Sequence, residues 1–300
     1  MRVLVTDGMD VGALEQLRAD GFEMVEQFYE PDELGNALRD FDAVIIRSAT
    51  KIKEPQIDAA KGSRLKLIVR AGVGVDNIAV KYAEEAGIAV KNTPRASFNA
   101  VAELALALLF SCARNISIAG HTMREQKWEK KAYSKGFELM GKTVGIIGYG
   151  RIGQMAGQKC QALGMNVLSY VHKHKPENCE CDTMHFVTKE EVLAQSDMIV
   201  LCAPGGDKPL VDAESIAQMK DGVVIVNVSR GSNVDEAALL EALNSGKVRA
   251  AGLDVWLSEK NPNWELAAHP AVSCLPHIGA GTKEAQKRIG AELVDIIKSF

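Results

Sequence analysis

The sequence predicts an α/β protein of two lobes, each built on a doubly wound parallel sheet. At 300 residues, the chain exceeds one typical domain and is long enough for two buried cores. Short β-branched runs alternate with longer helical patterns almost throughout, which is typical of βαβ units. A glycine-rich turn joins one such run directly to a helical stretch within residues 143–160. These three observations predict lobes of the Rossmann-like and flavodoxin-like kind.

The first lobe is predicted from four strand-like runs, at residues 2–7, 42–49, 65–72 and 88–93. The stretch from Ala96 to Gly120 then follows alanine and leucine spacing without proline, so one long helix is expected to cross into the second lobe. The final segment, Lys283 to Phe300, is amphipathic. We expect it to return to the first lobe as a helix.

The second lobe is predicted from six further runs, at residues 143–148, 166–170, 197–204, 222–227, 250–255 and 271–275. Six strands separated by helical stretches suit a dinucleotide-binding domain. The predicted boundaries are therefore 1–95 and 283–300 for a discontinuous substrate domain and 96–282 for a cofactor domain inserted into it.

Composition argues against several classes of function. The net charge of -4 and the isoelectric point near 5.9 disfavour a nucleic-acid-binding surface, which needs clustered positive charge. Six scattered cysteines indicate reduced thiols in a cytoplasmic protein, and the pair Cys179 and Cys181 lacks the further ligands of a metal site. The chain opens on a strand-like run, so no signal peptide is expected. Its longest apolar stretch carries Glu103, so no membrane partner is expected either.

The glycine-rich turn is a candidate cofactor site. Gly148, Gly150 and Gly153 lie between an apolar run and a helical stretch, and Arg151 and Ile152 lie in the same turn. The first glycine permits a tight turn, the second lets the backbone approach a pyrophosphate, and the third lets helix and strand pack closely. Another strand-like run about twenty residues further on strengthens the prediction of a bound dinucleotide.

The end of that further run leaves the choice between NAD(H) and NADP(H) open. A site that prefers NAD carries Asp or Glu there, whereas this chain has Val171 followed by His172 and Lys173. Without a carboxylate there is no repulsion of a 2'-phosphate, and the lysine supplies a counter-charge. The alternative is a solvated basic loop that tolerates either cofactor.

Three polar residues that follow apolar runs in the last third of the chain are candidates for catalysis. Arg230 lies in NVSRG, Glu259 in GLDVWLSEKNP and His277 in LPHIG. An arginine can hold a carboxylate through two hydrogen bonds, and a carboxylate favours a protonated imidazole. The structural alternatives are a capped turn, a solvated carboxylate and a satisfied core histidine. All three residues lie in loops that follow predicted strands, and this shared position favours the catalytic interpretation.

Several longer segments, taken together and in this order, resemble the D-2-hydroxyacid dehydrogenase family. They are IIRSATKI, VRAGVGVDNI, NTPRASFNAVAE, KWEKK, GKTVGIIGYGRIG, NVSRGSNVDEAALLEAL, GLDVW and PHIGAGT, and they cover essentially the whole chain. Within the family, the phosphoglycerate dehydrogenases are the most similar branch. The resemblance implies two lobes with the active site in the cleft, hydride transfer between a 2-hydroxy acid and a nicotinamide cofactor, and a homodimer formed through the cofactor domains.

The resemblance also implies roles for individual residues. Arg230 would bind the substrate carboxylate and polarise the C2 oxygen, His277 would act as general acid and base, and Glu259 would pair with His277. Further residues are implied at the cofactor site: Pro204, Val228, Ser229, Asp254 and Gly279. Around Pro204 the chain departs from its relatives, which commonly have histidine before this proline and threonines after it.

Residues that choose the substrate are expected in the first lobe. Arg47 and Ser48 come after the apolar residues DAVII, and Arg70 comes at the end of LKLIV. Arginine at such places suits a phosphate. The carboxylate end of the substrate would be completed by Asn92 and by the backbone around Val73 and Gly74. Lys130 and Lys131 resemble residues that reach a partner subunit's site, or they are ordinary surface lysines.

The predicted activity is the oxidation of 3-phospho-D-glycerate to 3-phosphohydroxypyruvate, the first step of L-serine synthesis. The nearest alternative is an NADP(H)-dependent reductase of hydroxypyruvate or glyoxylate. A more distant alternative is a non-enzymatic, NAD(H)-sensing protein of the corepressor kind. Because the chain ends at Phe300, without the serine-binding domain of longer relatives, we expect no allosteric inhibition by serine.

Overall fold

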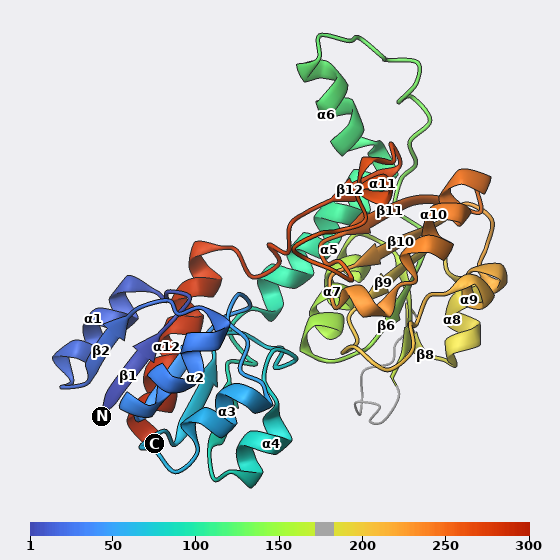
Figure 1. The fold of residues 1–300 in the computed structure, drawn as a ribbon. Helices are drawn as coiled ribbons and strands as arrows, with labels where there is room; N and C mark the ends of the chain where they lie inside the picture. The colour runs from blue at the N-terminus through green and yellow to red at the C-terminus, as the bar shows by residue number, and fades with distance from the viewer. Residues whose placement is uncertain (172–182) are drawn as a thin grey trace. The chain divides into compact units, whose positions relative to one another are not determined.

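The computed structural model describes residues 1–171 and 183–300 and divides into two compact units. Unit 1 comprises Met1–Phe98 and Ala280–Phe300, and unit 2 comprises Asn99–Gly279. Unit 2 is therefore inserted into unit 1, and Figure 1 shows the blue and red ends of the chain together in one unit.

The boundaries between the units lie three residues from the positions expected from the sequence. Ala96 belongs to unit 1 because it is buried in that core and its carbonyl accepts a hydrogen bond from Arg288 Nε at 2.8 Å. Ala280 belongs there as well, since its carbonyl accepts a hydrogen bond from Gln286 Nε2 at 2.9 Å. Side-chain anchors to the last helix therefore decide where each unit ends.

Unit 1 is a five-stranded parallel sheet in the order β2-β1-β3-β4-β5. Its strands are β1 (Arg2–Val5), β2 (Glu23–Glu26), β3 (Ala43–Ile46), β4 (Leu67–Arg70) and β5 (Ala89–Asn92). Its helices are α1 (Val11–Ala19), α2 (Pro31–Ala37), η1 (Leu38–Asp40), α3 (Glu54–Ala60), α4 (Val80–Glu85) and α12 (Lys283–Ser299). Residues of α1 and α12 form one apolar core with the strands, and residues of α2, α3 and α4 form another, as expected for a doubly wound sheet.

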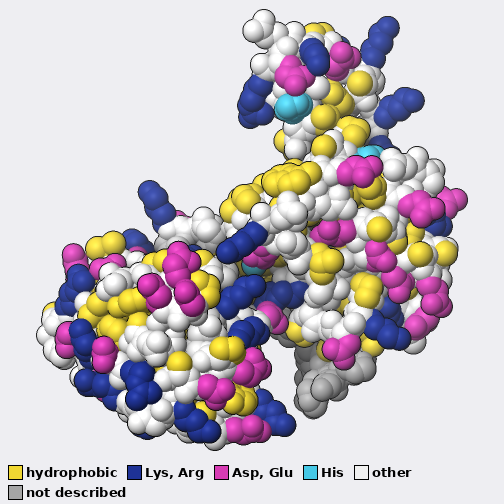
Figure 2. All heavy atoms as spheres, in the orientation of Figure 1, with side chains coloured by type: hydrophobic (Ala, Val, Ile, Leu, Met, Phe, Trp, Pro, Cys, Tyr) yellow, Lys and Arg dark blue, Asp and Glu magenta, His cyan; other side chains and the backbone are white. Residues whose placement is uncertain are grey.

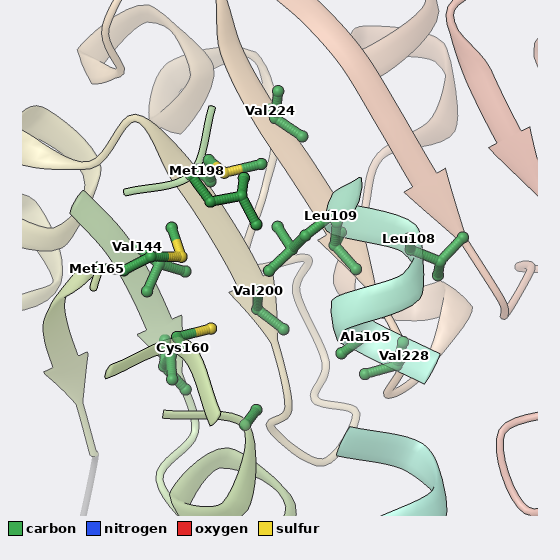
Figure 3. Packing of buried hydrophobic residues seen from close by; sticks show 14 of the residues in the cluster. Ala105, Leu108, Leu109, Val144, Cys160, Met165, Met198, Val200, Val224 and Val228 are labelled. Carbon is green, nitrogen blue, oxygen red and sulfur yellow. The ribbon is translucent and has the colours of Figure 1, made fainter. Parts of the chain in front are cut away.

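Unit 2 is a seven-stranded parallel sheet in the order β12-β11-β10-β9-β6-β7-β8. Its strands are β6 (Thr143–Ile147), β7 (Asn166–Tyr170), β8 (Met184–Phe186), β9 (Met198–Leu201), β10 (Val223–Asn227), β11 (Val248–Leu253) and β12 (Val272–Cys274). Its helices are α5 (Phe98–Arg114, whose first residue belongs to unit 1), α6 (Ile116–Arg124), α7 (Arg151–Ala162), α8 (Lys189–Gln195), α9 (Ala213–Gln218), η2 (Gly231–Asn233), α10 (Glu236–Ser245) and α11 (Trp264–Ala268). Figure 3 shows Ala105, Leu108 and Leu109 of α5 beside Val200 and Val224 of the sheet. The predicted fold class is confirmed.

Two edge strands and one helix break were not expected from the sequence. β2 and β8 are short edge strands with charged or polar residues, so they present no apolar run. The single helix expected from Ala96 to Gly120 is instead α5 and α6, divided at Asn115. This residue has a φ of 54°, in the left-handed region that asparagine tolerates better than most residues.

The helix α6 has no buried residue and, in Figure 1, projects beyond the sheet of unit 2. Within residues 1–171 and 183–300, no single helix is both long and apolar enough to cross a membrane. The bent pair α5 and α6 meets that test by length and composition only.

The strand register of unit 2 brings the ends of three strands level with one another. Asn227 of β10 pairs with Leu253 of β11, which pairs with Cys274 of β12. All three strands are parallel, so the loops that follow them begin side by side at one edge of the sheet. These loops carry the three residues that the sequence singles out for catalysis.

Candidate active site

The loops after β10, β11 and β12 are fastened to one another by backbone and indole contacts. Gly231 lies so close to the next loop that a Cβ atom there would overlap the backbone of Trp256. The indole Nε1 of Trp256 donates a hydrogen bond to the carbonyl of Leu275 at 2.9 Å. Trp256 is almost fully buried, so this bond is shielded from water. The three loops therefore form one connected assembly.

Asp254 fixes the loop that carries His277. Its two carboxylate oxygens accept hydrogen bonds from the amides of Ile278 and Gly279 at 2.8 and 2.9 Å, and its carbonyl accepts one from the His277 amide at 2.8 Å. The side chain is only 1% exposed. Burial raises the pKa of the Asp254 carboxyl above its usual range, against the opposite effect of the amide of Ile278. Asp254, predicted from the sequence to lie at the cofactor site, thus orients the loop that carries His277.

His277 and Glu259 are in direct contact. The distance from His277 Nδ1 to Glu259 Oε1 is 2.5 Å, and both side chains are partly exposed to solvent. His277 has a φ of 55°, an uncommon backbone conformation that is maintained by the bond of its amide to the Asp254 carbonyl and by the bonds of the next two amides to the Asp254 carboxylate. Because Nδ1 faces the carboxylate, the other ring nitrogen, Nε2, is left to exchange a proton with a reactant.

Arg230 lies in a turn that two buried asparagines hold in place. Asn227 Nδ2 donates a hydrogen bond to the Arg230 carbonyl at 2.8 Å, and its Oδ1 accepts one from the Ser229 hydroxyl at 2.8 Å. Asn233 Nδ2 bridges Ser229 Oγ and the carbonyl of Ala203, both at 2.9 Å. The guanidinium Nη1 of Arg230 donates to the Ser229 carbonyl at 2.6 Å. These bonds therefore fix the backbone of Arg230 and one nitrogen of its guanidinium.

The glycine-rich turn has the shape that a dinucleotide requires. Gly148 has a φ of 98°, and a Cβ atom there would lie 2.5 Å from Ala203 N. A Cβ atom on Gly153 would overlap the carbonyl of Gly148, whereas one on Gly150 would meet no atom within 4 Å. The space beside Gly150 is open, and the N-cap residue of α7 is this glycine, which has no side chain to cap the first turn. Uncapped amides at this helix end, which begins with Arg151 and Ile152, fit a pyrophosphate.

The residues predicted around the rest of the cofactor are spread over the carboxyl ends of neighbouring strands. Val171 follows β7 and packs against the apolar core, Pro204 lies in an exposed loop after β9, and Val228 and Ser229 are buried after β10. Gly279 lies against Asp254, since a Cβ there would be 3.0 Å from Asp254 Oδ2. His172 and Lys173, on which the choice between NAD(H) and NADP(H) depends, lie outside the described residues.

The residues predicted to select the substrate lie at the carboxyl ends of the unit 1 strands. Arg47 and Ser48 follow β3, and Arg70 ends β4, where it pairs in register with Asn92 of β5. Arg70 Nη1 donates to the carbonyl of Ala71 at 2.6 Å. Its guanidinium lies over Gly72, where a Cβ atom would overlap it. Only glycine at this position permits that arrangement.

Two more predicted residues belong to the loop that follows β4. Asn92 Nδ2 donates a hydrogen bond to the carbonyl of Val73 at 2.6 Å, and Val73 and Gly74 are at least partly exposed. Asn92 therefore shapes the loop whose backbone was predicted to bind a carboxylate.

Lys130 and Lys131 are exposed and lie in the turn-rich segment after α6. They belong to the projecting part of unit 2, well away in the sequence from the three catalytic candidates. Within the described parts of the chain, no three His, Cys, Asp or Glu side chains gather as metal ligands.

Sequence reasoning missed the residues that hold the site together. Asn227, Asn233 and Trp256 make the bonds that position Arg230 and the His277 loop, and Asp7 and Asn77 hold the Arg47 turn in unit 1. The signal for the first two was their place beside a serine and a glycine in NVSRGSN, because asparagine side chains often close such turns. No comparable local signal exists for Trp256.

Comparison with known proteins identifies the family. Residues 106–279, more than half of the chain, match the profile described as D-isomer specific 2-hydroxyacid dehydrogenase, NAD binding domain. The chain belongs to this family. The resemblance seen in the sequence is thereby confirmed, and the cofactor of this D-2-hydroxyacid dehydrogenase is a nicotinamide dinucleotide.

Individual relatives divide between two activities. The chain is 44% identical over 303 residues to a hydroxypyruvate reductase of Thermotoga maritima, covering 99% of this chain and 97% of the relative. It is 40% identical over 301 residues to a D-3-phosphoglycerate dehydrogenase of Archaeoglobus fulgidus, covering 99% of this chain but 56% of that relative. The chain thus spans little more than half the length of this dehydrogenase.

A solved structure agrees in fold over the full chain. The D-lactate dehydrogenase of Aquifex aeolicus, complexed with NAD and lactic acid, has a TM-score of 0.89 and 27% sequence identity. The match covers 100% of this chain and 95% of that one. It supports the family assignment but does not decide between the two activities.

Proposed function

We propose that this D-2-hydroxyacid dehydrogenase interconverts 3-phospho-D-glycerate and 3-phosphohydroxypyruvate, the first step of L-serine synthesis. The observation that carries the proposal is the pair of arginines at the ends of two adjacent unit 1 strands, Arg47 after β3 and Arg70 on β4. Guanidinium groups suit a phosphate dianion, and a substrate without phosphate would need no such pair.

The chemistry in this proposal uses the three candidate residues of unit 2. Arg230 binds the carboxylate and polarises the oxygen on C2, as a guanidinium with fork-shaped donors can. His277 Nε2 accepts the hydroxyl proton during oxidation and returns it to the C2 oxygen during reduction. Glu259, at 2.5 Å from Nδ1, orients the imidazole. When bound, the nicotinamide supplies or accepts the hydride at C2.

A second candidate function is an NADP(H)-dependent reduction of hydroxypyruvate or glyoxylate. Two observations favour it: the similar-length relative from Thermotoga maritima is a hydroxypyruvate reductase, and Val171 stands where an NAD-preferring site would carry an acid. The two candidates share the catalytic residues and differ in the group that unit 1 must bind.

A matrix of initial rates distinguishes the candidates. NADH and NADPH would each be assayed with 3-phosphohydroxypyruvate, hydroxypyruvate, glyoxylate and 2-oxoglutarate. The proposal predicts that kcat/KM for 3-phosphohydroxypyruvate exceeds that for hydroxypyruvate by about tenfold or more, the effect of one charged hydrogen bond. Equal values, or a preference for hydroxypyruvate with NADPH, would establish the second candidate instead.

We further propose that the protein acts in the cytoplasm as a homodimer formed through the cofactor domain. Large apolar side chains are exposed at the end of α5, on α6 and just after it, namely Phe110, Ile116, Met123 and Trp128. Figure 2 shows hydrophobic surface among charged side chains on this projecting segment. Light scattering should give twice the chain mass of 32.4 kDa, and a monomer would contradict the proposal.

A further inference from the structure

The turn from Arg47 to Thr50 is held at both of its ends by two side chains from elsewhere in unit 1. Asp7 Oδ2 accepts hydrogen bonds from the amides of Arg47 and Thr50, at 2.6 and 3.1 Å. Asn77 Nδ2 donates to the carbonyls of the same two residues, both at 2.7 Å. Asp7 therefore binds the two backbone amides and Asn77 binds the two backbone carbonyls, so both ends of the turn are fixed.

Asp7 is directed at this turn rather than at solvent. It follows β1, the strand adjacent to β3 in the sheet. Its second oxygen, Oδ1, lies 2.7 Å from the hydroxyl of Thr50, which is itself buried and lies 2.8 Å from the hydroxyl of Thr6. Three hydrogen bonds thus converge on one carboxylate.

The two residues in the middle of the turn are exposed, unlike the hydrogen-bonded residues at its ends. Ser48 and Ala49 are exposed, and within the described residues their amides form no hydrogen bond. A fixed turn with two open amides, a serine hydroxyl and the Arg47 side chain is a concentrated set of donors for an anion. An anion that binds to a turn already fixed in this conformation loses less conformational entropy.

We propose that Asp7 and Asn77 are positioning residues, which pre-organise the turn Arg47–Thr50 as the receptor for the anionic group at C3 of the substrate. This inference rests on the proposed function, because it takes that group to be the phosphate. Neither side chain touches the substrate in this account. Their effect is on substrate selection and not on the proton and hydride transfer carried out in unit 2.

The test compares Asp7→Asn with a matched control, Asp42→Asn. Asp42 also accepts a hydrogen bond from a backbone amide in unit 1, that of Arg2 at 2.6 Å. It precedes β3, however, and so lies at the amino ends of the strands, whereas Asp7 follows the carboxyl end of β1. We expect Asp7→Asn to raise KM for 3-phosphohydroxypyruvate about tenfold and to change kcat less than about twofold. Asp42→Asn should lower the unfolding temperature while leaving KM within about twofold. Equal effects of the two variants on KM would overturn the proposal.

A second pair of measurements keeps the inference testable if Asp7→Asn folds poorly or if the substrate proves to be unphosphorylated. Asn77→Ala should raise KM in the same way. Hydrogen exchange of the peptide covering residues 46–51 should be about tenfold faster in either variant, and unchanged in Asp42→Asn. A wild-type enzyme without preference for the phosphorylated substrate would defeat the proposed function alone. Unchanged exchange at 46–51 in both variants would defeat the positioning role itself.

Discussion

The loops of unit 2 that carry the catalytic candidates and the unit 1 loops that carry the arginines occupy equivalent places, yet they are fastened differently. Both sets follow the carboxyl ends of parallel strands. In unit 2 the loops hold one another, through Gly231 against Trp256, Trp256 to Leu275, and Asp254 to the His277 loop. In unit 1 the contacts are polar side chains: Asp7 and Asn77, from the loops after β1 and β4, hold the Arg47 turn. Arg70 is placed by the absence of a side chain at Gly72.

In the proposed function, unit 2 carries out the reaction and unit 1 chooses the substrate. A change in one loop of unit 2 is transmitted to its neighbours, so the geometry of Arg230, Glu259 and His277 is kept or lost as a whole. A change at the Arg47 turn or at Arg70 alters the group that unit 1 offers to the substrate and leaves the contacts among the unit 2 loops in place. We therefore expect variants of unit 2 to act mainly on kcat and variants of unit 1 mainly on the preference between substrates.

The largest effect is expected from His277→Asn. Loss of the general acid and base should lower kcat by about a thousandfold with every substrate, because proton transfer to and from the C2 oxygen is lost. Steady-state kinetics with saturating cofactor measures it. His269→Asn is the control, since the bond that the described residues show for the His269 ring is a local one, accepted from the Ala271 amide. A His277→Asn enzyme with wild-type kcat would remove this residue from the mechanism.

The next largest effect is expected from Gly231→Ala. The added Cβ would overlap the backbone of Trp256 and force apart the Arg230 and Glu259 loops. We expect destabilisation of about 1–3 kcal/mol and a fall in kcat/KM of about a hundredfold, since small displacements of catalytic groups are costly. Thermal unfolding and kinetics would be measured together. Gly206→Ala is the control, because its Cβ would meet nothing closer than 3.8 Å. Equal behaviour of the two variants would show that the loops are not tightly coupled.

A smaller effect is expected from Trp256→Phe. The ring would still fill its buried site, but the hydrogen bond from Nε1 to the Leu275 carbonyl would be lost. One buried neutral hydrogen bond is worth about 1 kcal/mol, so kcat should fall about fivefold. Trp264→Phe, at a largely exposed tryptophan, should leave kcat unchanged. If kcat is also unchanged in Trp256→Phe, this bond does not position the His277 loop.

The sequence predicted those parts of the molecule that local pattern decides. Buried strands such as β6 and β10 consist mainly of apolar residues, and the glycine-rich turn has fixed spacing, so the fold and the cofactor loop could be recognised. The edge strand β2 was missed because its residues, EMVE, show no apolar run. The division of one expected helix at Asn115 was missed because it depends on a single backbone conformation.

The candidate catalytic residues were recognisable, but the residues that position them were not. Arg230, Glu259 and His277 stand beside glycine or proline after strands, which is a local signal. Asp7 lies 40 residues from Arg47 in the sequence, and Trp256 lies 19 from Leu275. Such side-chain to backbone bonds follow from the tertiary fold, so no local pattern indicates them.

The central claim, that unit 1 chooses the substrate while unit 2 performs the reaction, is tested most directly by one ratio. The ratio is kcat/KM for 3-phosphohydroxypyruvate divided by kcat/KM for hydroxypyruvate, measured in the wild type, Arg47→Gln and His277→Asn. Arg39→Gln serves as the control, since in the described part of the chain the side chain of that arginine donates to the carbonyl of Ala59 and to no strand-end loop. Arg47→Gln should lower the ratio about tenfold with kcat for hydroxypyruvate unchanged, and His277→Asn should leave the ratio within about twofold. A ratio that does not move in Arg47→Gln, or that moves equally in both variants, would contradict the claim.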